Sequence, residues 1–159
     1  MRRPLARATR LRRGILACTL PLVAALGGCG ASGSVEPNPG VAPLVGFWEA
    51  TRMVITNVAN PTVAPDLIEL GAKFTFDVEP SGQYTAILVF AGQSSTEIGM
   101  LTLNGNVLTM QRQHPSPQVS TSRITLEGDR LTMDGPTEFD FNLDGTPEAA
   151  TAHIELVRK

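Results

Sequence analysis

One segment of the chain, residues 99–133, contains the same pattern twice. Met100–Met110 and Arg123–Met133 share the sequence Thr-Leu-x-Gly-x-x-Leu-Thr-Met. Each copy alternates apolar residues with threonine, passes through a polar turn that contains glycine, and then alternates again. This pattern is typical of a tight β-hairpin, because successive side chains of a strand point to opposite faces and glycine accepts the backbone angles of a short turn. The repeat therefore predicts at least two successive hairpins, which together form an antiparallel meander.

A meander of this length has two free strand edges unless it closes on itself. Free edges present unpaired backbone groups that invite association, and closure into a barrel removes them. After Met133, Asp134-Gly135-Pro136 either bends one long strand or separates two short ones. We prefer one bent strand, because eight strands close antiparallel and nine do not. The sequence thus predicts an all-β fold, an antiparallel up-and-down meander closed into a small, about eight-stranded β-barrel, with further strands at 45–56, 73–78, 83–90, 96–103 and 150–157.

The first 28 residues have the composition of an export signal. Six arginines and no acidic residue lie before Gly14, residues 14–26 are almost wholly apolar, and the run ends in Leu26-Gly27-Gly28-Cys29. A basic start, a short apolar core and small residues at the exit are typical of a secretory signal, which is too short and wrongly flanked for a membrane-spanning helix. We therefore expect residues 1–28 to be a cleaved signal peptide.

The end of this signal resembles the lipobox of bacterial lipoproteins, in which the peptidase cuts before a cysteine that carries lipid on its sulfur. The resemblance implies acylation of Cys29 and a mature protein tethered to a membrane of the bacterial cell envelope. Because Gly30 and not aspartate follows Cys29, it also implies sorting to the outer membrane, facing the periplasm. The alternative is an ordinary signal peptide with a chance cysteine. Residues 29–43 are rich in Gly, Ser and Pro and are predicted to be a flexible tether, followed by one domain over 44–159.

The composition of the mature chain excludes several classes of function. Six of the 13 Lys and Arg residues precede Cys29, which leaves 7 bases against 15 acids and a side-chain charge near −8. With no basic stripe, a nucleic-acid partner is not expected, and neither is attraction to an anionic bilayer surface. Cys18 leaves with the signal and Cys29 carries lipid, so the domain has no thiol for a disulfide, a metal or catalysis. Since no nucleophile motif or phosphate loop is present either, we expect no enzymatic activity.

The two ends of the expected domain resemble the lipocalin-like proteins, which include bacterial lipoproteins. Gly46-Phe47-Trp48 opens the first strand, a long connection over 57–71 follows it, and Arg158 ends the last strand. The resemblance implies that Trp48 closes the narrow end of a lipocalin-like barrel and that Arg158 lies across its ring, a cation–π contact worth about 0.5–2 kcal/mol. The Thr-Asp-Tyr-type motif of that family is absent, and the corresponding turn here is 127–130.

The interior of an eight-stranded barrel is either filled by side chains or has room for one small ligand. Our leading hypothesis is that this barrel binds a small apolar or amphipathic molecule. The alternative is a filled barrel that serves as a structural or protein-interaction module, although no protein partner is indicated. The residues expected to line a hollow interior are apolar and belong to the predicted strands: Phe74, Phe76, Phe90, Leu101, Leu103, Met110 and Met133.

A short acidic loop near the C-terminus is similar to the opening half of a calcium-binding loop. Oxygen-bearing side chains recur at the ligand spacing of such a loop, at Asp140, Asn142, Asp144 and Glu148. The closing bidentate glutamate is missing, because Thr151 occupies its position. The sequences on both sides of the loop are typical of strands, whereas a calcium loop of this kind is flanked by helices. The alternative is an Asp-Gly hairpin turn with solvated acids. Calcium is the single candidate cofactor, and no other is expected.

Overall fold

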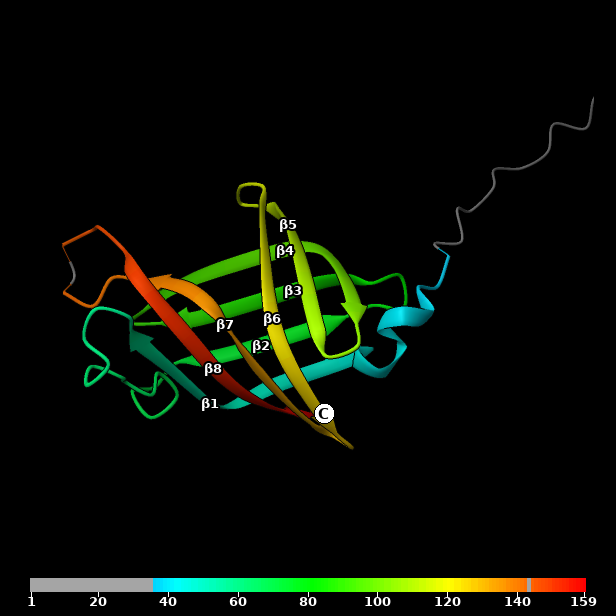
Figure 1. The fold of residues 1–159 in the computed structure, drawn as a ribbon, viewed down its shortest axis with the longest axis horizontal. Coiled ribbons are helices and arrows are strands. Elements are labelled where there is room, and N and C mark those ends of the chain that lie inside the picture. Colours follow the sequence, from blue (N-terminus) through cyan, green and yellow to red (C-terminus); the bar gives the residue numbers. More distant parts are fainter. Residues whose placement is uncertain (1–35, 143) are drawn as a thin grey trace, which may run out of the picture. The chain divides into compact units, whose positions relative to one another are not determined.

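Eight antiparallel strands form a closed barrel in the computed structural model of the chain (Figure 1). The structure describes residues 36–142 and 144–159, and all eight strands belong to one compact unit, Ser34–Lys159. Each strand pairs with its neighbours in the chain, and β1 pairs with β8 to close the barrel. The predicted all-β meander of eight strands is confirmed. The strands are β1 (Gly46–Asn57), β2 (Lys73–Val78), β3 (Gln83–Phe90), β4 (Gln93–Asn104), β5 (Val107–His114), β6 (Gln118–Glu127), β7 (Arg130–Phe139) and β8 (Glu148–Arg158).

The repeat corresponds to two hairpins, β4–β5 and β6–β7. Leu101 lies opposite Met110 in the first hairpin, and Leu126 lies opposite Leu131 in the second. The strand that follows the second turn is continuous, which confirms one bent strand in place of two. Pro136 is tolerated within β7 because β6 pairs with β7 only as far as Asp134. The missing N–H of the proline therefore costs no hydrogen bond to β6.

The connection between β1 and β2 completes the barrel wall where β2 is absent. β1 pairs with β2 only from Gly46 to Glu49. Farther along, Ile55 N donates to Pro65 O at 3.0 Å, and Leu67 N donates to Met53 O at 2.8 Å. Leu67 is buried in the core, so this connection acts as an additional short strand along the second half of β1.

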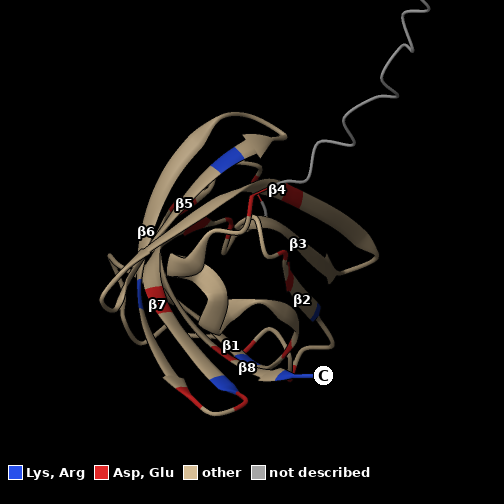
Figure 2. Cartoon of the chain, turned by 90° about the vertical axis from the view of Figure 1, so that its right-hand side faces the viewer, with Lys and Arg blue, Asp and Glu red and all other residues tan. Residues whose placement is uncertain are grey.

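A short helix closes one end of the barrel. Residues Pro39–Leu44 form the 3-10 helix η1, whose N-cap Asn38 accepts a hydrogen bond from Gly40 N. Side chains three residues apart in such a helix lie on one face, and here that face contains Val41 and Leu44, both fully buried. In the end-on view of Figure 2, the coiled ribbon of η1 lies across the ring of strands. Residues 38–44 therefore pack as part of the barrel, and η1 overlaps the end of the predicted tether over 29–43. Within the described residues, no helix has the length and apolar character needed to cross a bilayer.

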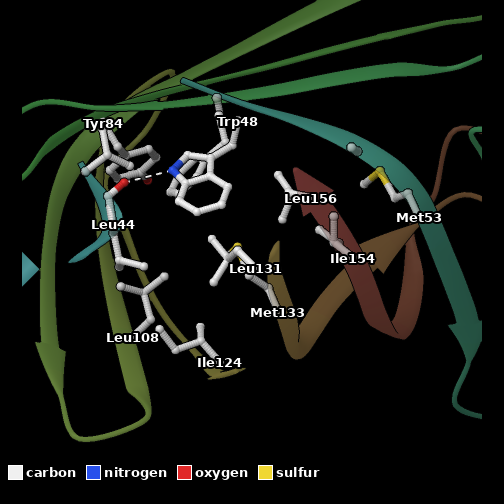
Figure 3. Close-up of a cluster of buried hydrophobic side chains, with 14 of the residues drawn as sticks. Leu44, Trp48, Met53, Tyr84, Leu108, Ile124, Leu131, Met133, Ile154 and Leu156 are labelled. Atoms are coloured by element: carbon white, nitrogen blue, oxygen red, sulfur yellow. Dashed lines mark hydrogen bonds between the residues drawn. The ribbon is translucent and has the colours of Figure 1, made fainter. Parts of the chain in front are cut away.

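The bulk of the core lies in the half of the barrel next to η1. Figure 3 shows Trp48 and Tyr84 there together with a layer of leucines from several strands. The side chains buried in this layer include Leu44, Trp48, Tyr84, Leu108, Leu131 and Leu156. Farther along β3 and β8, the inward positions Ala86 and Ala150 carry only a methyl group. The far half of the barrel is consequently less densely filled.

Candidate functional site

The half of the barrel away from η1 contains a cavity of about 850 Å³. Its lining includes Phe74 near the start of β2, Leu88 near the end of β3, Ser120 near the start of β6 and Ala150 near the start of β8. These strand ends are opposite to the β2–β3 turn, where Asn38 N donates to Pro80 O at 2.8 Å next to η1. Small-molecule sites typically measure about 300–1,000 Å³. The volume is therefore sufficient for one ligand.

The deep wall of the cavity is apolar and contains three methionines. Met53 from β1, Met110 from β5 and Met133 from β7 line it together with Phe76 and Ile154. Methionine side chains are flexible and polarisable, so they adapt to ligands of irregular shape. This wall is suited to a hydrocarbon chain.

The structure brings together four of the seven residues that we expected to line a hollow interior. Phe74, Phe76, Met110 and Met133 line the cavity. The other three lie elsewhere in the fold. Leu101 is fully buried in the densely packed half, Leu103 lies opposite Leu108 near the β4–β5 turn, and Phe90 is the half-buried last residue of β3.

Another part of the cavity wall is polar and was not anticipated from the sequence. Tyr84, Glu97 and Arg112, on β3, β4 and β5, form a connected group. The Tyr84 hydroxyl donates to Oε1 of Glu97 at 2.5 Å, and Nη1 of Arg112 lies 3.4 Å from Oε2 of the same carboxylate. Glu97 and Arg112 both line the cavity, and so do Ser120 and Ser122 of β6. We call Tyr84, Glu97 and Arg112 the polar triad.

Close packing around Gly99 positions the polar triad. Gly99 lies opposite both Tyr84 and Arg112. A Cβ atom at Gly99 would lie 2.8 Å from Cε1 of Tyr84 and 2.3 Å from the carbonyl oxygen of Gln111, so only glycine lets the tyrosine ring lie against β4. Burial, followed by the hydrogen bond to Glu97, raises the pKa of Tyr84. The phenol therefore stays protonated and remains a donor.

The sequence contained a signal for this wall. Glu97 is two residues before Gly99 and four before the buried Leu101, so the period of two puts it on the inner face of β4. Arg112 follows Met110 by two on β5 in the same way. The sequence pattern that indicated this wall was one charged residue on the inner face of each of two neighbouring strands.

The floor of the barrel joins both ends of the compact unit. Trp48 is fully buried, and its indole N–H donates to Leu44 O at 2.8 Å. The guanidinium carbon of Arg158 lies 4.2 Å from the centroid of the Trp48 ring. The same guanidinium donates to the carbonyl oxygens of Val45 and Pro43, the latter at 2.8 Å. The two residues expected as a floor pair are thus in direct contact, and they join β1, β8 and η1.

The acidic loop between β7 and β8 uses its side-chain oxygens within the loop. Asp140 accepts hydrogen bonds from Asp144 N and Gly145 N, at 3.2 and 2.8 Å. Asn142 Oδ1 also accepts from Asp144 N, and Glu148 accepts from Phe141 N at 2.9 Å. Among the residues that the structure describes, no group of three or more His, Cys, Asp or Glu side chains is arranged to hold a metal ion. Calcium binding by this loop stays a prediction.

A second charged group lies on the outer face of the barrel. His153 Nδ1 lies 2.7 Å from Asp134 Oδ1, and His153 Nε2 lies 3.3 Å from Glu155 Oε1. Glu155 also contacts Nη1 of Arg52 at 3.2 Å, and Nε of Arg52 lies 3.6 Å from Asp66 in the β1–β2 connection. The hydrogen bond to Asp134 is the largest cause of a raised pKa of His153. This group joins β7, β8 and β1 on the outside of the barrel, away from the cavity.

Comparisons with protein families and curated proteins assign no family to this chain. No protein-family model matches the chain, and no curated protein matches it. Cys29, the predicted lipidation site, lies outside the described residues, so its lipidation stays a prediction. The function therefore has to follow from the geometry of the barrel itself.

Proposed function

We propose that this protein is a lipid-anchored, lipocalin-like barrel of the bacterial cell envelope that binds one small amphipathic molecule. The observation that carries the proposal is the cavity of about 850 Å³ inside a barrel of eight strands. Barrels of this size can fill their interior with side chains. Here alanines occupy inward positions at the cavity end, including Ala86 and Ala150, where larger side chains would fill the space.

The two walls of the cavity favour an amphipathic ligand over a purely apolar one. The methionine-lined wall offers dispersion contacts to a hydrocarbon chain, while the polar triad and the serines of β6 offer hydrogen bonds. A wholly apolar ligand would cover these polar groups without replacing their hydrogen bonds to water, which is costly. One polar group on the ligand removes that cost.

A neutral fluorophore, N-phenyl-1-naphthylamine, tests for ligand binding. We expect saturable fluorescence enhancement with the chain that begins at Ser34, since the compact unit Ser34–Lys159 contains all strands and the core. Ala152 lines the cavity, and the variant Ala152→Trp should weaken binding by about tenfold or more by filling it. The control is Thr85→Trp, at a position between the inward residues Tyr84 and Ala86 of β3. Failure of the fluorophore to bind, or equal affinity in both variants, would contradict the proposal.

The anchor needs a separate experiment, since it is supported by sequence alone. Bacteria expressing the full chain and fed an alkyne-labelled palmitate should incorporate the label into the wild-type protein. Cys29→Ser should abolish labelling, because the proposed lipid is carried on the sulfur of this cysteine. Labelling that persists in Cys29→Ser would rule out this residue as the lipidation site.

A further inference from the structure

We infer that the polar triad selects ligands whose polar group is uncharged and both donates and accepts hydrogen bonds, such as a fatty alcohol or a primary fatty amide. This inference rests on the proposed function and names the ligand class of the same cavity. It makes Glu97 and Arg112 specificity-determining residues, with Tyr84 as a positioning residue.

The remaining hydrogen-bonding capacity of the triad defines what it can recognise. A carboxylate has about four acceptor sites and a guanidinium has five donors. The Glu97 carboxylate accepts one bond from Tyr84 and one from Arg112. Arg112 makes two more bonds, from Nε to Ser116 O at 2.8 Å and from Nη2 to Ser116 Oγ at 3.3 Å. Both side chains thus keep acceptor or donor capacity, and both line the cavity.

The spacing of the two charges disfavours an ionised ligand. Because Nη1 of Arg112 lies only 3.4 Å from Oε2 of Glu97, a ligand group that contacts one of them lies close to the other. A carboxylate attracted by Arg112 would be repelled by Glu97, and an ammonium attracted by Glu97 would be repelled by Arg112. A charge buried without a partner is costly. A hydroxyl or carboxamide can donate to Glu97 and accept from Arg112 without that cost.

The triad is held in place before any ligand arrives. Tyr84 fixes one oxygen of Glu97 from β3, and Ser116 in the β5–β6 loop fixes the far side of Arg112. The side chains of Glu97 and Arg112 are 29% and 24% exposed, so neither is free in solvent. A preformed arrangement of this kind discriminates between ligands, because it cannot relax around a mismatched group without losing its own bonds.

Displacement of the fluorophore by a matched ligand series tests the inference. The competitors share a twelve-carbon chain and differ only in the head group: dodecanol, dodecanamide, dodecanoate and dodecylammonium, used below their micelle-forming concentrations at neutral pH. With the wild-type chain from Ser34, we expect both neutral compounds to displace the dye at about tenfold lower concentration than either ion.

Two variants should change the charge preference in opposite directions. Glu97→Gln leaves Arg112 without its counter-charge, so dodecanoate should gain about tenfold relative to dodecanol. Arg112→Gln leaves Glu97 unpaired, so dodecylammonium should gain by a similar factor. The matched controls are Glu49→Gln and Lys159→Gln, which change the net charge equally at an exposed ion pair of 3.2 Å. Both controls should keep the wild-type order of affinities.

The outcomes separate this inference from the proposed function. If the fluorophore binds but the wild-type protein prefers an ion, or if neither variant shifts the order, the inference is overturned and the ligand cavity stands. If the fluorophore does not bind at all, the proposed function fails, and the inference fails with it. Each variant gives its own answer, so the loss of folding in one of them still leaves a decisive comparison in the other.

Discussion

Replacement of Trp48 by phenylalanine tests how the closed end of the barrel is held. The variant keeps an aromatic ring but removes the indole N–H, which donates to Leu44 O at 2.8 Å in a fully buried site. Leaving that carbonyl without its donor costs about 1–2 kcal/mol. The weaker contact with Arg158 costs about 0.5 kcal/mol, and the void left by the smaller ring costs about 1 kcal/mol. We therefore expect the free energy of unfolding to fall by about 3 kcal/mol, a large share of the stability of a small domain.

Urea unfolding followed by far-UV circular dichroism measures this loss. Circular dichroism is required because Trp48 is the only tryptophan in the chain. The neighbouring Phe47 is 43% exposed, and its replacement by leucine serves as the control, with an expected change below about 0.5 kcal/mol. A loss below about 1 kcal/mol in Trp48→Phe, or one equal to that of the control, would refute the role assigned to the floor.

Three further predictions concern a turn, a close approach and a titrating side chain. Ala91 has a φ of +50° in the β3–β4 turn, so Ala91→Asn should stabilise the protein by about 1 kcal/mol in urea unfolding, and a lower midpoint would contradict this. Gly99→Ala should cost about 2–3 kcal/mol in the same assay, because its Cβ would lie 2.3 Å from Gln111 O, and a neutral effect would be inconsistent with that contact. The hydrogen bond to Asp134 raises the pKa of His153 above 6.5. The stability that His153 adds relative to His153→Gln should therefore be complete below pH 6.5 and be lost as the pH rises through the raised pKa. Unfolding curves across pH 5–9 that show no such loss would contradict this prediction.

The sequence was sufficient for the fold because its local signals agreed with one another. Alternation and turn glycines predicted β2 and β3 with the bounds that the structure has, Lys73–Val78 and Gln83–Phe90. The repeat predicted two hairpins, and the cost of free edges then required the first and last strands to pair. That pairing runs from Trp48 opposite Arg158 to Asn57 opposite Ala150.

Two features of the structure required more than local pattern. Residues 38–43 were assigned to the tether because the segment 29–43 is rich in Gly, Ser and Pro, yet Val41 and Leu44 are three residues apart and share the buried face of η1. Whether this segment forms a helix or a tether depends on an apolar surface against which Val41 and Leu44 can pack, and only the closed barrel supplies that surface. The polar triad was missed because its members are far apart in sequence and meet only through the β3–β4 and β4–β5 registers, the latter shifted between Ile98 and Gly99.

Methyl NMR of the methionines tests the central claim most directly, namely that the far half of the barrel is a ligand cavity. The chain from Ser34 contains four methionines, of which Met53, Met110 and Met133 line the cavity and Met100 does not. Titration of protein labelled with 13C at the methionine methyl groups with dodecanol should shift the first three signals saturably and with one common affinity, while the Met100 signal stays in place. Signals that all remain unmoved, or a Met100 signal that moves as far as the others, would contradict the claim.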